Sequence, residues 1–485
     1  MFYNLKTKIN NQRGQILIQI IVFGSVAVLI FGGLVGWASI NIGISKREFN
    51  RELAIQIAEA GIDYYRWHLA HAPQDFQDGT GAPGPYTHIY YDKNNNPIGQ
   101  FILTITPPPV GSTLVNILSE GRVNADFTVK RIIEVQMGIP SWAKFSYVSN
   151  NYVWFGETEP VVGLLHSNAG IRIDSTADNL VTSAVATYND PDHSGANEFG
   201  VHTHKAPTDP FPPASVPIRT DVFLVGRQFP VPAVDFAGLS SDLSQLKTNA
   251  QSNGRYFASS GGQGYHLVLK TNDTFDIYRV TSLVNVPGSC STNAPNKNTY
   301  SINNKTLLQS NQPFPSNGII FVEDHVWVDG QIDSAKITIA SGRFPESSST
   351  NTNIIINNNL LYSAYNGTDT IGLIAQGNFF IGLKSANNLE VDAAILAKNG
   401  STMRYYYDSH CGSEYLRNSL TMRGMSGSYL RGNAFAWVNC GTCTIITSGY
   451  NTVTTIYDAN LLYTPPPSFP LTSDQYSTLS WKEVK

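Results

Sequence analysis

The sequence predicts a mainly β protein carried on one long N-terminal α-helix, and three observations lead to this fold class. Residues 14–45 carry no charge, and short apolar runs recur through the rest of the chain. Only 14% of residues are charged while 42% are hydrophobic, and Asn, Ser, Thr and Gly are abundant, which favours strands and turns. We expect a basic leader (1–14), a helix (15–72), a small antiparallel sheet (73–140), and a parallel β-helix-like (solenoid) domain (141–485) with an inserted segment at about 188–315.

The uncharged segment is long enough to cross a membrane as a helix. Residues 16–44 would span about 43 Å at a rise of ~1.5 Å per residue. The hydrocarbon core of a bilayer is about 30 Å thick, and a cleaved secretory signal has a shorter apolar run of roughly 7–15 residues. We therefore expect a single-pass segment in contact with membrane lipid.

The charges around this segment predict its orientation. Glu48 is the first acidic residue of the chain, and basic residues precede the apolar run. Basic residues stay on the cytoplasmic side of a membrane. The N-terminus should therefore be cytoplasmic and the chain from about residue 46 extracytoplasmic. The basic residues are Lys6, Lys8 and Arg13.

The helix is predicted to continue beyond the membrane as an amphipathic segment. Apolar residues recur at steps of three or four, the spacing of one helix face, while charged residues occupy the other faces. Pro73 and the Gly/Pro-rich residues 78–85 should end the helix. The predicted apolar stripe consists of Phe49, Leu53, Ile57, Ala60, Tyr64 and Trp67.

The remaining chain predicts two kinds of β structure. Residues 86–105 and 113–137 each alternate apolar and polar side chains around a turn, which indicates a small antiparallel sheet. From Trp142 onward, apolar runs of three to six residues alternate with Gly, Asn and Asp at roughly ten-residue intervals. Such spacing is typical of a β-solenoid or of a sandwich. Residues 188–235 are rich in Pro, Asp and His, which predicts a segment inserted between these strands.

The cysteines predict disulfide chemistry if the domain is exported. The chain has four cysteines, and an even number in an exported protein permits disulfides. The Cys440–Cys443 pair also has the spacing of metal or redox sites, and free thiols are a third interpretation. We take Cys411, Cys440 and Cys443 as the disulfide candidates and leave the fourth cysteine, Cys290, out of that set.

Motifs for catalysis and cofactors are missing from the sequence. It has no His-Glu-x-x-His pair, nucleophile elbow, phosphate loop or Rossmann glycine pattern, so we expect no enzyme and no cofactor. The net charge of −4 gives no basic excess for nucleic acid. His202 and His204 could ligate a metal if they lay on a strand, but a surface loop is the preferred interpretation.

Acidic residues leave two further alternatives open. Asp174 with Asp178, and Asp324 with Asp329, could offer oxygen ligands to calcium, although their spacing matches no defined loop. Carboxylates clustered on one solenoid face could cleave glycans, and the candidates for that chemistry are Asp324, Asp329, Glu390 and Asp392.

The N-terminal region resembles that of PilX-type minor pilins. The resemblance rests on a short basic leader, Arg13-Gly14, the apolar helix, and Gln56-Ile-Ala-Glu-Ala-Gly61 followed by aromatic residues. It implies that a prepilin peptidase cuts between Gly14 and Gln15 and that the helix packs in a filament core. Such pilins have Phe after the glycine and Glu at the fifth mature position. This chain has Gln15 and Gln19 instead.

The C-terminal half is also similar to large PilX-like proteins. This likeness rests on the order of several segments between residues 318 and 470, among them Gly318-Ile-Ile-Phe-Val322 and Ile371-Gly-Leu-Ile-Ala375, and it implies a parallel β-helix. Independently, Gly32 and Gly36 have the spacing that lets a second helix approach closely, and glycines tolerated in a lipid-facing helix are the alternative.

Together these features predict a minor pilin-like structural subunit of a type IV pilus or related filament, with a role in assembly, tip display or adhesion. Its partners would be membrane lipid, other pilin-like subunits and, if the chain is processed, a prepilin peptidase. The alternative is a single-pass membrane-anchored extracellular β-helix protein, either an adhesin or a glycan-cleaving enzyme.

Overall fold

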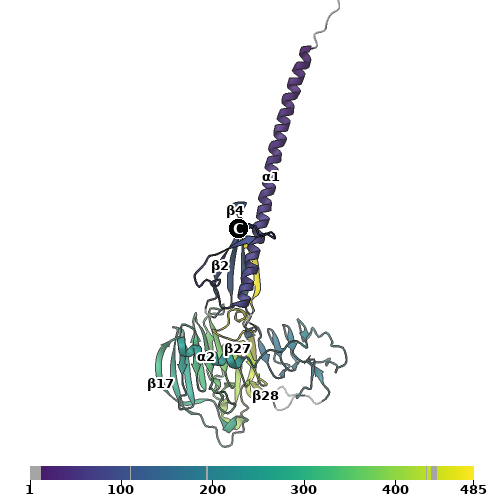
Figure 1. The fold of residues 1–485 in the computed structure, drawn as a ribbon. Coiled ribbons are helices and arrows are strands. Elements are labelled where there is room, and N and C mark those ends of the chain that lie inside the picture. The colour runs from purple at the N-terminus through teal and green to yellow at the C-terminus, as the bar shows by residue number, and fades with distance from the viewer. Residues whose placement is uncertain are drawn as a thin grey trace, which may run out of the picture. The chain divides into compact units, whose positions relative to one another are not determined.

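The computed structural model describes residues 13–109, 111–192, 195–432, 434–438, 445–473 and 475–484. The chain forms two compact units: unit 1 contains Met1–Thr106, Asn116–Met137 and Thr478–Lys485, and unit 2 contains Pro107–Val115 and Gly138–Ser477. The predicted fold class is confirmed, because a long N-terminal helix is followed by β structure with antiparallel and parallel sheets (Figure 1).

Unit 1 is built on one uninterrupted helix, α1 (Arg13–His71), which is purple in Figure 1. Its 59 residues correspond to about 88 Å at 1.5 Å per residue. The helix ends two residues before Pro73, whose ring cannot continue a helix. The helix is therefore far longer than the sheet it carries, so only part of it packs against the rest of unit 1.

A five-stranded sheet completes unit 1, in the order β1-β2-β3-β4-β30. The β1–β2 and β2–β3 pairs are antiparallel. The last strand lies within the range predicted for the second domain, but it extends the small sheet, where ion pairs join Arg131 to Glu483 and Glu134 to Lys482. The strands are β1 (Tyr86–Tyr91), β2 (Pro97–Thr106), β3 (Val115–Val123), β4 (Asp126–Gly138) and β30 (Ser477–Val484).

The helix packs on this sheet through small residues. A Cβ atom added at Gly121 of β3 would lie 2.0 Å from the Ala54 carbonyl oxygen and 2.6 Å from the Ala58 amide nitrogen. The sequence predicted a stripe of large apolar residues instead, and its two ends are exposed: Phe49 by 68% and Trp67 by 60%. The buried face is rotated by about one residue, because small side chains let the sheet come closest. It consists of Ala54, Ile57, Ala58, Ile62, Tyr65 and Leu69.

Unit 2 contains a main stack in which strands pair in parallel with strands one turn later. One ladder runs β18-β20-β23-β25-β27-β29, and a second runs β15-β19-β21-β24-β26. Isoleucine, leucine, valine and phenylalanine side chains from these strands form one large buried cluster. The strands are β14 (Arg255–Phe257), β15 (Gly264–Lys270), β18 (Ile319–Val322), β19 (Val326–Ile332), β20 (Lys336–Ser341), β21 (Ile354–Ile356), β22 (Leu360–Tyr362), β23 (Thr370–Ala375), β24 (Phe379–Ile381), β25 (Asn388–Ala397), β26 (Thr402–Met403), β27 (Leu416–Ser428), β28 (Ala436–Val438) and β29 (Ile446–Tyr457).

A small stack precedes the main stack in the sequence and joins it at β27. Its strands β5, β7, β9 and β13 form one parallel ladder, and β6, β8 and β12 form another. The first of them, β5, pairs in parallel with residues 426–428 of β27. The strands are β5 (Tyr147–Ser149), β6 (Val153–Phe155), β7 (Leu165–Ser167), β8 (Ile171–Ile173), β9 (Val181–Ser183), β12 (Val201–His202) and β13 (Arg227–Gln228), with an antiparallel pair β10 (Thr187–Tyr188) and β11 (Glu198–Phe199).

The range predicted as one inserted segment, at about 188–315, does not form a single insertion. Residues 255–270 contain β14 and β15, which pair in parallel with β18 and β19 and so belong to the main stack. Helix α2 (Leu239–Asn253) connects the two stacks along the chain. The remaining part is an antiparallel pair, β16 (Thr274–Leu283) and β17 (Ile302–Pro313), which adds to β15. Polar turns separate β14 and β15 from the strands that follow. For this reason no sequence pattern marks where the main stack begins.

Candidate functional site

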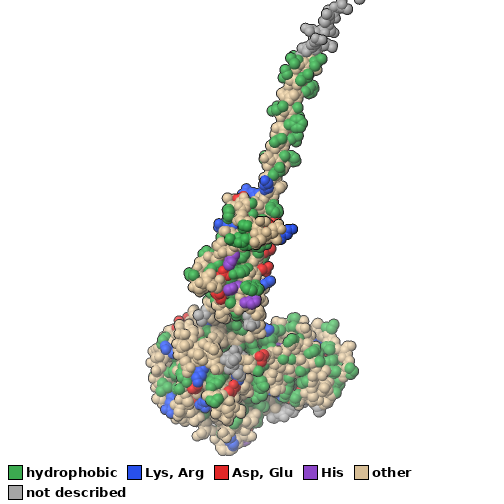
Figure 2. All heavy atoms as spheres, in the orientation of Figure 1, with side chains coloured by type: hydrophobic (Ala, Val, Ile, Leu, Met, Phe, Trp, Pro, Cys, Tyr) green, Lys and Arg blue, Asp and Glu red, His purple; other side chains and the backbone are tan. Residues whose placement is uncertain are grey.

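The outer half of α1, residues 15–49, exposes its apolar side chains on all faces. Every large apolar side chain from Ile16 to Phe49 is between 46% and 76% exposed, and Figure 2 shows them along the rod. The helix has an 18-residue window with a mean hydropathy of 2.5, none of it buried. By length and composition this helix can cross a membrane.

The residues predicted for processing and for the filament core all lie in this half. Gly14 and Gln15 fall in the first turn of α1, and the Gln19 side chain is exposed. Apart from the adjoining residues and backbone of α1, no atom of the described chain lies within 4 Å of a Cβ built at Gly32 or Gly36. These glycines therefore contribute nothing to packing within the described chain, in contrast to Gly121 in the sheet. Cleavage at Gly14 and helix packing at Gly32 and Gly36 remain predictions.

The inner half of α1, residues 50–71, is fixed by its C-terminal turn. The Asp75 carboxylate accepts hydrogen bonds from the Gln77 and Gly79 amides at 2.8 and 2.7 Å, and lies 3.1 Å from His68 Nε2. These contacts, the Gln77 bond most of all, lower the pKa of Asp75. Tyr65, fully buried, donates its hydroxyl hydrogen to the Asp75 carbonyl oxygen at 3.0 Å. The turn thus attaches the chain beyond the helix to its buried face.

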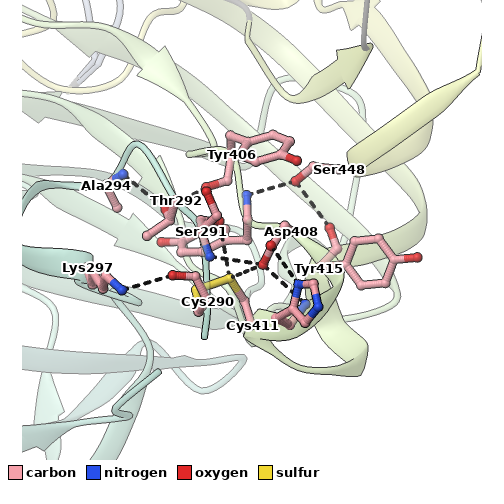
Figure 3. The surroundings of a disulfide bond; sticks show 12 residues. Cys290, Ser291, Thr292, Ala294, Lys297, Tyr406, Asp408, Cys411, Tyr415 and Ser448 are labelled. Carbon is pink, nitrogen blue, oxygen red and sulfur yellow. Dashed lines mark hydrogen bonds and ion pairs between the residues drawn. A yellow bond between two sulfur atoms is a disulfide. The ribbon is translucent and has the colours of Figure 1, made fainter. Parts of the chain in front are cut away.

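A disulfide joins Cys290 to Cys411 in unit 2 (Figure 3). Both cysteines are buried beside Leu383 and Tyr407. Cys411 was among the predicted disulfide residues, but its partner Cys290 was not in that set, since four cysteines allow three pairings. Cys440 and Cys443 lie outside the described residues.

The segments around the disulfide are also held by polar contacts (Figure 3). Lys297 Nζ donates to the Cys290 carbonyl oxygen at 3.0 Å, and the Ser291 amide donates to the Asp408 carboxylate at 3.0 Å. The cross-link spans 121 residues of sequence. Loops of this size restrict the unfolded chain by on the order of 4–5 kcal/mol in the entropy model, so the bond ties residues 284–301 firmly to the segment after β26.

The carboxylates considered for calcium are occupied by protein donors. Asp324 lies 2.7 Å from an Arg343 nitrogen, and Asp329 lies 2.9 Å from His266 Nε2. Asp178 accepts a hydrogen bond from the Gly163 amide, and Asp174 forms an ion pair with Arg172 at 2.7 Å. Each of these carboxylates thus has a structural role within the stacks.

Asp392, considered for glycan cleavage, lies inside the wall of the main stack. Its side chain is fully buried and accepts hydrogen bonds from the Tyr362 amide and the Tyr365 hydroxyl at 3.0 and 3.2 Å. Burial, above all, raises the pKa of Asp392 to about 6. Glu390 lies two residues before it on β25. A polysaccharide in solvent cannot reach a carboxylate so enclosed, so the raised pKa reflects burial in the wall.

The sequence favours a surface loop for His202 and His204. The structure instead places His202 on β12 and buries it completely. His204 lies just after β12, outside any strand, and its side chain is 14% exposed. Asp190 lies close to both rings, and Glu198 contacts His204 at 3.0 Å. Glu198 was not predicted to lie beside these histidines, because its strand, β11, has only two residues and gives no pattern in the sequence.

No family model matches the sequence, and neither does any curated protein. Among solved structures, the competence-associated pilin ComZ from Thermus thermophilus aligns with 90% of this chain and 97% of its own, at 12% sequence identity and a TM-score of 0.29. A TM-score this low does not establish a shared fold, so the likeness to ComZ carries no conclusion about this chain.

Proposed function

We propose that this chain is a minor pilin-like structural subunit of a type IV pilus or a related filament, with a role in assembly, tip display or adhesion. The observation that carries the proposal is the exposure of apolar side chains on every face of residues 16–45, in a helix that continues without a break into the packed inner half. A helix that is apolar all round needs lipid or other helices around it. A pilin helix meets both, first in the membrane and then in the filament.

In this proposal the protein works mechanically and not as an enzyme. The outer half of α1 is held in the membrane and later among other pilin-like helices, and unit 2 is displayed outside the cell. The Cys290–Cys411 disulfide supports an extracytoplasmic location for unit 2, because disulfides persist in oxidising compartments. Basic residues at the start of the chain support the same orientation.

Mass spectrometry of the native N-terminus tests the proposal. We expect a chain that begins at Gln15 with a methylated amine. Gly14→Ile should block this cleavage, and Gly24→Ile, in an open position of the same helix, should leave it intact. A native chain that retains Met1 would refute processing and would favour the second candidate, a single-pass membrane-anchored surface protein, which the length of the helix alone supports.

Gln19 gives a test of the subunit's position. A glutamate at this position would pair with the N-terminal amine of a neighbouring subunit in a low-dielectric core, where an unpaired charge is costly. Gln19 offers only a neutral hydrogen bond, which fits a subunit at the tip. We expect immunogold labelling at filament ends for the native chain and along the shaft for Gln19→Glu. Shaft labelling of the native chain would contradict the tip position.

A further inference from the structure

Three side chains with metal-ligating atoms converge in the small stack of unit 2. One ligand atom each from Asp190, His202 and His204 lies within 4.8 Å of the other two. Two of the side chains are buried and the third is partly exposed: His202 is 0% exposed, Asp190 1% and His204 14%. His202 and His204 are two residues apart, and an extended chain turns such side chains to the same face.

His202 is the unusual member of this group. Within the part of the chain that the structure describes, neither of its ring nitrogens has a hydrogen-bond partner, and its nearest charged contact is Asp190 Oδ2 at 3.5 Å from Nε2, too long for a normal hydrogen bond. A buried polar group without a partner costs about 1–3 kcal/mol. The other buried histidine of the small stack, His166, has both ring nitrogens bonded, to Thr182 and Asn168 at 3.0 Å each.

Carboxylates lie beside both histidines. Asp190 Oδ2 is 3.5 Å from His202 Nε2, and Glu198 Oε1 is 3.0 Å from His204 Nε2. Carboxylate oxygens together with imidazole nitrogens are ligands that suit a divalent transition metal.

Arg172 is the group that could oppose a cation here. Its guanidinium is bound to Asp174, with contacts of 2.7 and 2.8 Å, and stacks over Trp154 at 4.7 Å. Its distance to Asp190 Oδ2 is longer, 3.6 Å. Arg172 is therefore bound more closely to Asp174 than to Asp190, and Asp190 Oδ2, which faces His202, accepts no hydrogen bond from the described residues.

We propose that Asp190, His202 and His204 bind one divalent transition-metal ion of the zinc type. Two imidazoles and a carboxylate are ligands that suit zinc, with bonds of about 2.0–2.2 Å, so the side chains need to close by about 1 Å. Glu198 contacts His204 Nε2 at 3.0 Å, as carboxylates do when they orient metal-bound histidines. The ion fastens the β10–β11 pair, which flanks Asp190, to β12 of the small stack.

Metal analysis of the full chain in detergent tests this site. After equilibration with Zn²⁺ and dialysis, we expect elemental mass spectrometry to find one zinc ion per chain. Co²⁺ in place of Zn²⁺ should give the visible absorption of a tetrahedral cobalt site. His202→Gln, His204→Gln and Asp190→Asn should each lower Zn²⁺ affinity, measured against a chromophoric chelator. Glu198→Gln should lower it by about 10–100-fold, as for other residues that orient ligands.

Two control variants show whether zinc binding depends on this cluster. His166→Gln removes a buried histidine of the same stack whose nitrogens are already bonded, and His410→Gln removes an exposed one. Both should keep the zinc. If His202→Gln fails to fold, His204→Gln carries the test, because that side chain is partly exposed. Absence of zinc from the native chain, retention of zinc in both histidine variants of the site, or equal loss in His410→Gln would overturn the proposal.

Discussion

The two halves of α1 have the same backbone conformation and opposite surroundings. In the inner half, Ala54, Ala58 and Leu69 are completely buried against the sheet, and a glycine of β3 is needed to let the helix approach. In the outer half every large apolar side chain is exposed and the glycines touch nothing in the described chain. The comparison teaches that packing within the chain explains only the inner half. The outer half is long and apolar enough to cross a membrane, and in hydrocarbon a helix satisfies the hydrogen bonds of its own backbone.

The largest expected effect concerns Gly121. A Cβ there would lie 2.0 Å from a helix carbonyl oxygen, and a backbone atom cannot swing aside. We expect Gly121→Val to cost more than the about 1–3 kcal/mol of ordinary overpacking and to unfold the sheet of unit 1, seen as loss of hydrogen-exchange protection in residues 86–137. Gly33→Val, at an open position of the outer half, is the control and should leave that protection unchanged. Equal protection in both variants would remove the distinction between the halves.

A matched pair of leucines measures the same difference with less disruption. Leu69 is 0% exposed and Leu29 is 76% exposed on the same helix. Leu69→Ala should lower the free energy of unfolding of unit 1 by about 2–5 kcal/mol, because it leaves a cavity under the sheet. Leu29→Ala should change it by less than about 0.5 kcal/mol. Chemical unfolding of the full chain in detergent gives both values, and a large loss for Leu29→Ala would show that the outer half also packs on the sheet.

A charge in the middle of the outer half tests the membrane medium. An arginine at the centre of a membrane helix costs about 2.5–3.5 kcal/mol on insertion scales. Ile30→Arg divides the apolar run into parts of 14 residues (16–29 and 31–44), each shorter than the ~20 residues that a span needs. We expect part of the protein to become extractable by carbonate. Ile218→Arg, at a site that is 90% exposed in unit 2, should stay membrane-bound, as should the native chain.

The smallest effect concerns pH and the turn that ends the inner half. The pKa of Asp75 is lowered in the folded protein, chiefly by the Gln77 amide. Its stabilisation is therefore present above the pKa of the unfolded chain and is lost as the pH falls through the lower, folded value. Asp75→Asn should cost about 1 kcal/mol at pH 7 and nothing in strong acid. Asp63→Asn, whose carboxylate is exposed on the same helix, should have no effect at either pH, and a pH-independent loss for Asp75→Asn would contradict the assignment.

Local features of the fold could be predicted from the sequence, and distant pairings could not. The helix followed from an uncharged run and from Pro73, and the hairpin at 86–105 from its alternation. The pairing of β5 with β27 has no such sign, because a strand of three residues offers too few positions to specify a register. The buried stripe of α1 was misplaced because the sheet comes closest at Ala54 and Ala58, and a stripe chosen mainly by large apolar side chains passes over these two alanines.

The sites divide in the same way. Spacing alone suggested a helix-packing role for Gly32 and Gly36, and that role stays a prediction. The partner of Cys411 lies 121 residues away, and no spacing rule selects it. The histidine cluster depends on Asp190 and Glu198, which belong to a stretch rich in Pro and Asp that reads as a loop. The cluster forms where the β10–β11 pair, which flanks Asp190, meets β12.

The junction of β5 with β27 has a consequence for how the protein is made. About 280 residues separate the two strands, so at 5–20 residues per second synthesis takes on the order of tens of seconds to supply the neighbour of β5. During that interval the small stack presents an open β edge to any other nascent chain. With only three residues in β5, that edge is a poor template for wrong partners, since very short edge strands resist aggregation.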